Sequence, residues 1–130
     1  MTAKTKVLIL GQDVNTVDYA NPALPPGMSA EKVTAGLAQA KASLEARGHD
    51  VDELQVLPDL AAAEAATVTQ LAGKAYDVVV IGAGIRNPPP SLALFETVVN
   101  AVHRHAPKAR IAFNTRPDDS DAAALRWLER

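Results

Sequence analysis

Two arginines in this sequence follow short apolar runs of the kind that form buried strands. Arg86 comes shortly after Val78–Ile81, and Arg116 comes shortly after Arg110–Phe113. A guanidinium offers paired N–H donors in a planar fork that matches a carboxylate or a phosphate, so either arginine could hold a small anion. The alternative is a surface arginine that pairs with a nearby aspartate, namely Asp13, Asp118 or Asp119.

Polar side chains also follow the first apolar run, Val7–Leu10. Among them, Asp13 could act as a general base or help to hold a metal ion, and its alternative role is to hydrogen-bond its own turn. Asn87 and Asn114 follow the later runs in a similar way. The predicted ligand-binding residues are Gln12, Asp13, Asn15, Gly82, Gly84, Arg86, Asn87, Asn114 and Arg116.

Histidine chemistry has one candidate. Glu96, Asn100 and His103 share one face of a predicted helix, which could bring a carboxylate near a histidine or could simply face solvent. His103 and Asp13 are the catalytic candidates. The sequence has no cysteine, which excludes thiolate nucleophiles, disulfides and zinc–thiolate sites, and it has no serine nucleophile elbow. We predict no metal site.

The segment Gly82-Ala83-Gly84 has the first two glycines of a dinucleotide-binding fingerprint but lacks the third. The prolines at 88–90 carry no N–H groups, so this turn is not built to cradle a diphosphate, and its glycines favour a sharp turn. A flavin site usually has a Ser/Thr-rich loop and aromatic side chains, and the first loop offers only Thr16 and Tyr19. We therefore predict no cofactor.

A regular alternation of strands and helices positions these residues. Strands are predicted at Val7–Leu10, Val51–Leu57, Val78–Ile81 and Arg110–Phe113, the second and fourth as edge strands. Helices are predicted from a Ser29 cap to Arg47-Gly48, from Ala61 to Ala72, from a Ser91 cap to Pro107, and from Asp118 to Glu129. The third helix should bury Leu92, Phe95, Val99 and Val102, and the last should bury Ala122, Leu125 and Leu128.

This alternation predicts the α/β class, with a three-layer, doubly wound parallel sheet in a single domain over residues 1–130. Two central and two edge-like runs predict the strand order 2-1-3-4, a flavodoxin-like winding with one strand fewer and two helices on each face. In such sheets ligands bind outside the carboxyl ends of the strands where the winding reverses, here between strands one and three. The segment Gln12–Met28, about 17 residues against the usual ~2–6, would cover that crevice.

The bulk composition limits the partners. A net charge of −2 and an aromatic content of 4% give no basis for a nucleic-acid partner or a membrane partner. The first apolar run is too short for a signal peptide or a membrane span, so we expect a cytoplasmic protein. The alanine-rich second helix and Trp127 offer surfaces that a homodimer could bury.

A further pattern is spread over most of the chain. It comprises Asp77–Arg86, Leu94–Glu96, Asn100, His103–Pro107, Ile111–Thr115 and Arg126-Trp127, with Val17–Tyr19 and the proline-rich part of the first loop. In these stretches the chain resembles an uncharacterised family of small bacterial α/β proteins, flavodoxin-like or Rossmann-like in fold. The resemblance implies the same fold, and it implies no activity, cofactor or catalytic residue.

Three classes of function fit these residues. The first is binding or turnover of a small anionic metabolite in the crevice, with Arg86 as the main contact and Asn87, Asn114 and Arg116 as further contacts. The second is a non-catalytic protein-interaction or regulatory module. The third is a small hydrolase-like enzyme that uses Asp13 or a histidine without a covalent serine or cysteine nucleophile. From the sequence alone, whether the protein is an enzyme stays open.

Overall fold

The computed structural model describes residues 4–22, 24, 26–86 and 91–128, in which strands and helices alternate. The strands are β1 (Lys6–Gln12), β2 (Asp50–Val56), β3 (Val78–Ile81) and β4 (Arg110–Phe113). The helices are α1 (Ala30–Ala46), α2 (Leu60–Gly73), the short α3 (Ala83–Arg86), α4 (Leu92–His105) and α5 (Ser120–Leu128). Among the elements that the structure describes in full, 3₁₀ turns lie at Val14–Thr16 and Pro117–Asp119.

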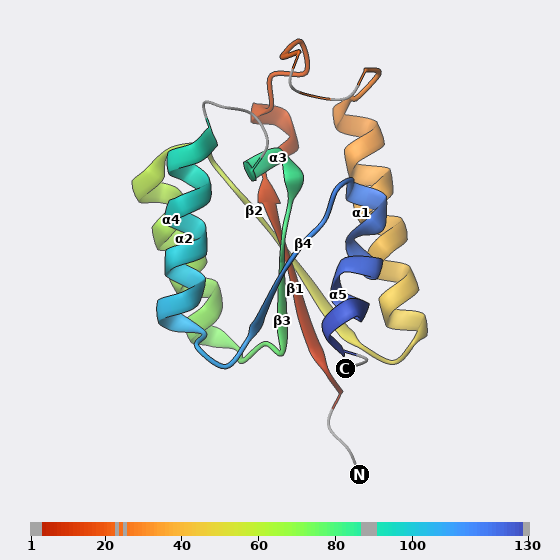
Figure 1. Ribbon diagram of the computed structural model, residues 1–130, viewed down its shortest axis with the longest axis vertical. Helices are drawn as coiled ribbons and strands as arrows, with labels where there is room; N and C mark the ends of the chain where they lie inside the picture. The colour runs from red at the N-terminus through yellow and green to blue at the C-terminus, as the bar shows by residue number, and fades with distance from the viewer. Residues whose placement is uncertain (1–3, 23, 25, 87–90, 129–130) are drawn as a thin grey trace.

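The strands form one parallel sheet in the order β2-β1-β3-β4 (Figure 1). The central strands are β1 and β3, in a register that aligns Val7 with Val78 and Leu10 with Ile81. The predicted α/β class, strand order and central pair are thereby confirmed, and the fold is flavodoxin-like. Because the strands are parallel, their carboxyl ends share one edge, near α3 in Figure 1.

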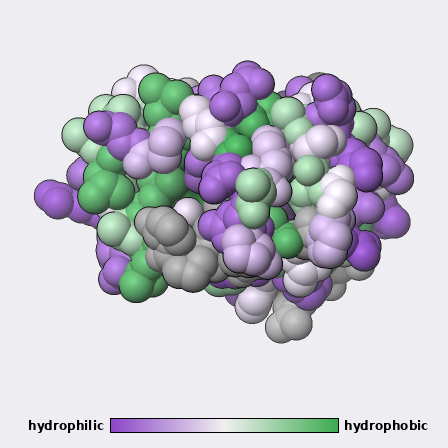
Figure 2. All heavy atoms as spheres, turned by 90° about the horizontal axis from the view of Figure 1, so that it is seen from above, coloured by the Kyte–Doolittle hydropathy of each residue, from purple (hydrophilic) through white to green (hydrophobic). Residues whose placement is uncertain are grey.

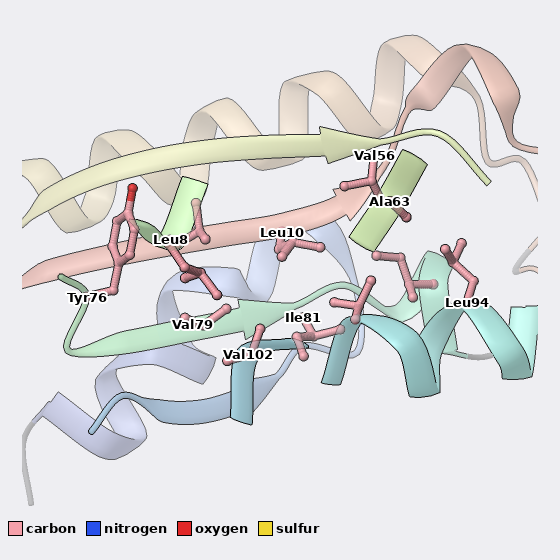
Figure 3. Close-up of a cluster of buried hydrophobic side chains, with 12 residues drawn as sticks. Leu8, Leu10, Val56, Ala63, Tyr76, Val79, Ile81, Leu94 and Val102 are labelled. Carbon is pink, nitrogen blue, oxygen red and sulfur yellow. The ribbon is translucent and has the colours of Figure 1, made fainter. Parts of the chain in front are cut away.

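Helices cover both faces of the sheet. We call the two sides the α2/α4 face and the α1/α5 face after the helices that pack on them (Figure 1). Side chains alternate along a strand, so Leu8 and Leu10 of β1 point to the α2/α4 face while Val7 and Ile9 point to the other. The α2/α4 core also contains Val56, Ala63, Tyr76, Val79, Ile81, Leu94 and Val102 (Figure 3). The α1/α5 core contains Leu44, Val51, Val78, Val80, Ala112, Ala123 and Ala124.

The helix ends follow local chemistry at most of the predicted positions. The Ser29 side chain accepts a hydrogen bond from the Lys32 N–H, and Asp59 caps α2 in the same way through the Ala62 N–H. After α1 the chain turns at Gly48, which has a φ of +91° that other residues rarely adopt. Ser91 occupies the N-cap of α4, but its side chain makes no capping bond. No helix within the described ranges is long and apolar enough to cross a membrane.

The predicted faces of α4 and α5 are confirmed in part, since Val102 is fully buried and four further residues pack against the cores: Phe95, Val99, Leu125 and Leu128. The remaining positions differ. On α4, Leu94 and Val98 are buried whereas Leu92 is 59% exposed, because α4 carries two overlapping apolar stripes and packing against α2 selects the one around Val98. On α5, Ala123 and Ala124 are buried and Ala122 is exposed. The 3₁₀ turn Pro117–Asp119 delays the start of this helix to Ser120, and this shift changes which residues face the sheet.

A charged network lies at the amino end of the edge strand β2. The Lys74 ammonium donates to the carboxylates of Asp50 and Asp52, at 2.8 and 2.9 Å. The Tyr76 hydroxyl donates to Asp52 at 2.7 Å. The hydrogen bond from Lys74, together with that from Tyr76, holds the pKa of Asp52 below its ordinary value despite partial burial. Asp52 is therefore ionised at neutral pH, and Lys74 holds both carboxylates in place.

Candidate functional site

The α1/α5 face of the sheet loses its core side chains at the carboxyl edge. On β1 this face carries Val7 and Ile9, and the alternation places Gly11 on it next. On β3 the same alternation leads from Val80 to Gly82. The two glycines are neighbours, since a Cβ on Gly82 would lie 3.7 Å from the Gly11 Cα. One layer of side chains is thus absent from this edge.

A cavity of about 90 Å³ occupies the place of the absent layer. A Cβ on Gly11 would meet no atom within 4 Å, so the space beside this residue is open. The apolar walls come from α1 and from the loop between β1 and α1: Val17, Tyr19, Leu24, Met28, Val33 and Leu37. The remaining lining residues are Gly11, Gln12, Gly82, Ala83, Gly84, Asn114, Thr115, Arg116 and Pro117. The cavity is therefore mostly apolar, and its polar groups are few.

The start of the first loop is held by its own side chains. The Asp13 carboxylate accepts a hydrogen bond from the Asn15 N–H at 2.9 Å, and the Gln12 amide donates to the Thr16 carbonyl and hydroxyl, both at 3.2 Å. Asp13 thus has the turn-forming role that was its alternative in the sequence analysis. Gln12 lines the cavity, whereas Asp13 and the exposed Asn15 do not.

Tyr19 fixes the middle of the same loop. Its hydroxyl donates to the Val14 carbonyl at 2.7 Å, so the ring that lines the cavity is tied to the segment above β1. Burial, together with the carboxylates of Asp13 and Glu31, raises the pKa of Tyr19. The hydroxyl therefore stays protonated and keeps donating at physiological pH.

Asn114 is a structural connector at the end of β4. It is 3% exposed, its side-chain oxygen accepts from the Ala83 N–H at 2.7 Å, and its side-chain nitrogen donates to the Ser120 hydroxyl at 2.8 Å. The side chain thereby joins β4 to the first residue of α3 and of α5. Asn114 borders the cavity, but these two bonds already engage its amide.

Arg116 brings a positive charge to the rim of the cavity. Its side chain is 67% exposed, and its Nε donates to Asp118 at 3.1 Å. Within the described ranges its terminal nitrogens make no hydrogen bond with the protein. An ion pair this exposed contributes little to stability, so it costs little to redirect the guanidinium toward a ligand.

The turn that carries Arg116 is held firmly. Asp119 accepts hydrogen bonds from the backbone N–H groups of Thr115 and Arg116 and from the Thr115 hydroxyl. Burial would raise the pKa of Asp119, but these bonds outweigh it and lower the pKa below its ordinary value. On the other side, a Cβ on Gly36 of α1 would lie only 3.1 Å from the Asp118 N, so α1 packs against this turn at glycine distance.

Arg86 lies apart from this cavity. The single turn α3, which was not predicted, directs its side chain toward β4, where Nη2 donates to the Asn114 carbonyl at 2.9 Å. The guanidinium carbon lies 5.4 Å from the centre of the Phe113 ring. Nη1 is buried and has no hydrogen-bond partner in the described part of the chain. Arg86 makes no ion pair with Asp13, the partner considered in the sequence analysis.

Two other predicted residues lie elsewhere. His103 is exposed in the last turn of α4, at the end of the helix that leads to the amino end of β4. Asn87 lies outside the described residues. Among the described residues no group of three or more histidine, aspartate and glutamate side chains could hold a metal ion.

Most of the apolar wall could not be predicted from the sequence. The spacing of Val33, Leu37, Ala40 and Leu44 predicts one core stripe along this helix, and it does not distinguish the first two, which line the cavity, from the last two, which are buried. The sequence did offer one signal, because the apolar stripe continues beyond the point along the sheet at which β1 and β3 end in glycine. Tyr19 and Met28 lie in a loop without periodicity, so nothing in the sequence fixed where they point.

A second, more polar hollow of about 310 Å³ adjoins the first. The two share Gln12, Val17, Leu24 and Gly84, and the second continues toward the starts of α2 and α4. Its other lining residues are Thr16, Asp18, Asn21, Pro58, Ser91 and Leu94.

Comparison with known proteins adds no function to this geometry. No protein-family model matches the chain, and no curated protein is significantly similar to it. The resemblance to small bacterial α/β proteins stays a prediction, and the function has to be argued from the site itself.

Proposed function

We propose that the protein binds a small anionic ligand at the carboxyl ends of β1 and β3. The observation that carries this proposal is the cavity beside Gly11 and Gly82. Arg116 lies at the rim of this cavity, and its guanidinium bonds to the described part of the protein only through Nε. Sheets of this winding bind their ligands at this edge. The loop between β1 and α1 supplies part of the cavity wall, and its length would suit a cover over the ligand.

Arg116 is the better candidate for the anion contact. The guanidinium of Arg86 donates to the Asn114 carbonyl and lies against Phe113, outside the cavity lining. Arg116 lines the cavity, and its exposed Asp118 partner engages only Nε. Its terminal nitrogens can therefore form a charge-assisted bond with a carboxylate or a phosphate.

The lining supports binding more than turnover. Among the described lining residues there is no carboxylate and no histidine, so a general base for hydrolysis would have to come from outside the lining. Asp13 is engaged in its own turn, and His103 lies on another part of the molecule. A ligand that fixes the covering loop could serve a regulatory module equally well, which keeps that alternative within the proposal.

An NMR titration of ¹⁵N-labelled protein with acetate, butyrate and phosphate tests the proposal. Shifts are expected at Gly11, Gly82 and Thr115, and Arg116→Gln should weaken binding about 10- to 100-fold because it removes a charge-assisted contact. The matched control is Arg104→Gln, an exposed arginine of α4, which should leave binding unchanged. Equal binding by Arg116→Gln and the wild type would contradict the assignment.

Self-association is a separate proposal that rests on another surface. Leu57, Leu60 and Leu92 are 51%, 45% and 59% exposed, and Figure 2 shows apolar surface gathered on the side of α2 and α4. A second copy of the chain could bury these side chains in a homodimer. Light scattering decides this, since a mass that stays at 13.7 kDa at all concentrations would rule the dimer out.

A further inference from the structure

We infer that the ligand is a short aliphatic carboxylate, with a chain of about three to four carbon atoms that enters the cavity and a carboxylate that contacts Arg116. This inference rests on the proposed function and narrows it to one chemical class. It excludes sugar phosphates and other ligands that are polar throughout. Three features of the site carry it: its lining, its size and the position of its single positive charge.

The lining selects an apolar group. Six of the side chains around the cavity come from α1 and the loop between β1 and α1, and all six are apolar or aromatic. The polar neighbours are largely engaged: the Asn114 amide holds Ala83 and Ser120, and the Gln12 amide holds Thr16. A hydroxyl-rich ligand would leave its own polar groups without partners against these apolar walls, which is costly.

The size limits the length of the chain. An apolar cavity of about 150 Å³ takes the six carbon atoms of benzene, which is about 25 Å³ for each carbon. On the same scale a cavity of about 90 Å³ holds about three to four carbon atoms. It is too small for a benzene ring, which fits an apolar cavity of about 150 Å³.

The charge fixes the orientation. Arg116 is exposed at the rim, whereas Gly11 and Gly82 lie at the sheet side of the cavity. A carboxylate at the rim would keep its second oxygen in water while the chain displaces water from the apolar interior. The turn Pro117–Asp119, held by Asp119 and packed against Gly36, fixes the backbone of Arg116 beside the cavity.

The experiment is a calorimetric titration with formate, acetate, propionate, butyrate, pentanoate, hexanoate and octanoate. Each buried methylene should tighten binding about fourfold up to butyrate or pentanoate, and longer chains should gain nothing further. Arg116→Gln should weaken every carboxylate but leave the binding of 1-butanol, the uncharged probe, unchanged.

A glycine series tests the position of the chain directly. Gly11→Ala should shorten the best-bound acid by about one carbon, and Gly11→Val should remove the dependence on chain length while acetate still binds through Arg116. The matched control is Gly73→Ala at the end of α2, where an added Cβ also meets no atom within 4 Å. It should leave the series as in the wild type.

The outcomes separate the inference from the proposed function. If phosphate or acetate binds in an Arg116-dependent way but affinity does not rise with chain length, the inference is wrong and anion binding stands. If Gly11→Val leaves the chain-length dependence intact, the chain lies outside this cavity and the inference is again wrong. If no anion binds, both the inference and the proposed function fall.

Discussion

The two faces of the sheet are built differently at the carboxyl edge. On the α2/α4 face, Leu10 and Ile81 fill the last layer and are fully buried beneath α4 and α2 (Figure 3). On the α1/α5 face, the next positions in the alternation are Gly11 and Gly82, and a cavity replaces the packing. The α2/α4 face is therefore packed with side chains up to the carboxyl edge, whereas the α1/α5 face has a cavity in place of the last packed layer.

The largest effect on stability should come from removing a side chain from the last packed layer of the α2/α4 face. Leu10→Ala removes a fully buried side chain from the α2/α4 core and should lower the free energy of unfolding by about 2–5 kcal/mol. Urea denaturation monitored by circular dichroism measures it. Leu57→Ala, at a leucine that is 51% exposed, is the matched control and should cost far less. Equal losses would mean that Leu10 is not part of a tightly packed layer.

The next effect concerns Asn114, whose side chain joins β4 to α3 and α5. Asn114→Ala leaves the Ala83 N–H without its acceptor and the Ser120 hydroxyl without its donor, so it should cost about 1–3 kcal/mol. Asn100→Ala is the control, because Asn100 is exposed and bonds only to the Glu96 carbonyl of its own helix. Thermal unfolding distinguishes them. A loss for Asn114→Ala no larger than for Asn100→Ala would contradict the connecting role.

Filling the hollow should stabilise the protein. Gly11→Val places a strand-forming side chain in open apolar space and should raise the free energy of unfolding by about 0.5–1 kcal/mol, while it removes the binding of longer carboxylates. Gly48→Ala should shift stability the other way, by about 1–2 kcal/mol, because Gly48 has a φ of +91°. Urea denaturation checks both signs. A destabilised Gly11→Val would mean that this space is not available to a side chain.

The smallest effect is electrostatic and concerns Asp52, at the amino end of β2. The pKa of Asp52 is lowered in the folded protein, chiefly by the hydrogen bond from Lys74 and then by that from Tyr76. Its contribution to stability is therefore present above the ordinary value of 3.8 and is lost as the pH falls through the lower, folded value. Between pH 6 and pH 2.5 the wild type should lose more stability than Asp52→Asn, as measured by urea denaturation. An identical pH dependence would contradict the assignment.

The fold was predictable because its signals are local and redundant. The run Val78–Ile81 is apolar at every position, as a strand covered on both faces must be, and the polar interruptions of β2 marked it as an edge. Ser29 and Gly48 marked the ends of α1 through capping and positive φ. These features depend on neighbours in sequence, so the order 2-1-3-4 could be deduced without coordinates.

The place of the cavity could be predicted from the sequence, but its lining could not. The glycines after β3 and the long loop indicated the carboxyl edge of the sheet, where the cavity lies, because both are unusual for a strand-to-helix connection. The direction of Arg86 depends on the single turn α3, which has no capping residue or periodicity to announce it. The roles of Asn114 and Arg116 depend on contacts with residues that a pattern does not connect, such as Ala83 and Gly36.

The Lys74 network on β2 also has a consequence for behaviour at high concentration. An unpaired edge strand is a template on which another chain can add by main-chain hydrogen bonds. Along β2, Asp50 and Asp52 are held in place by Lys74, and Glu53 is exposed beside them. An antiparallel copy that added to this edge would bring carboxylates opposite carboxylates, which opposes pairing. The carboxylates along β2 therefore oppose the addition of further strands, and with it fibril growth, at this edge of the sheet.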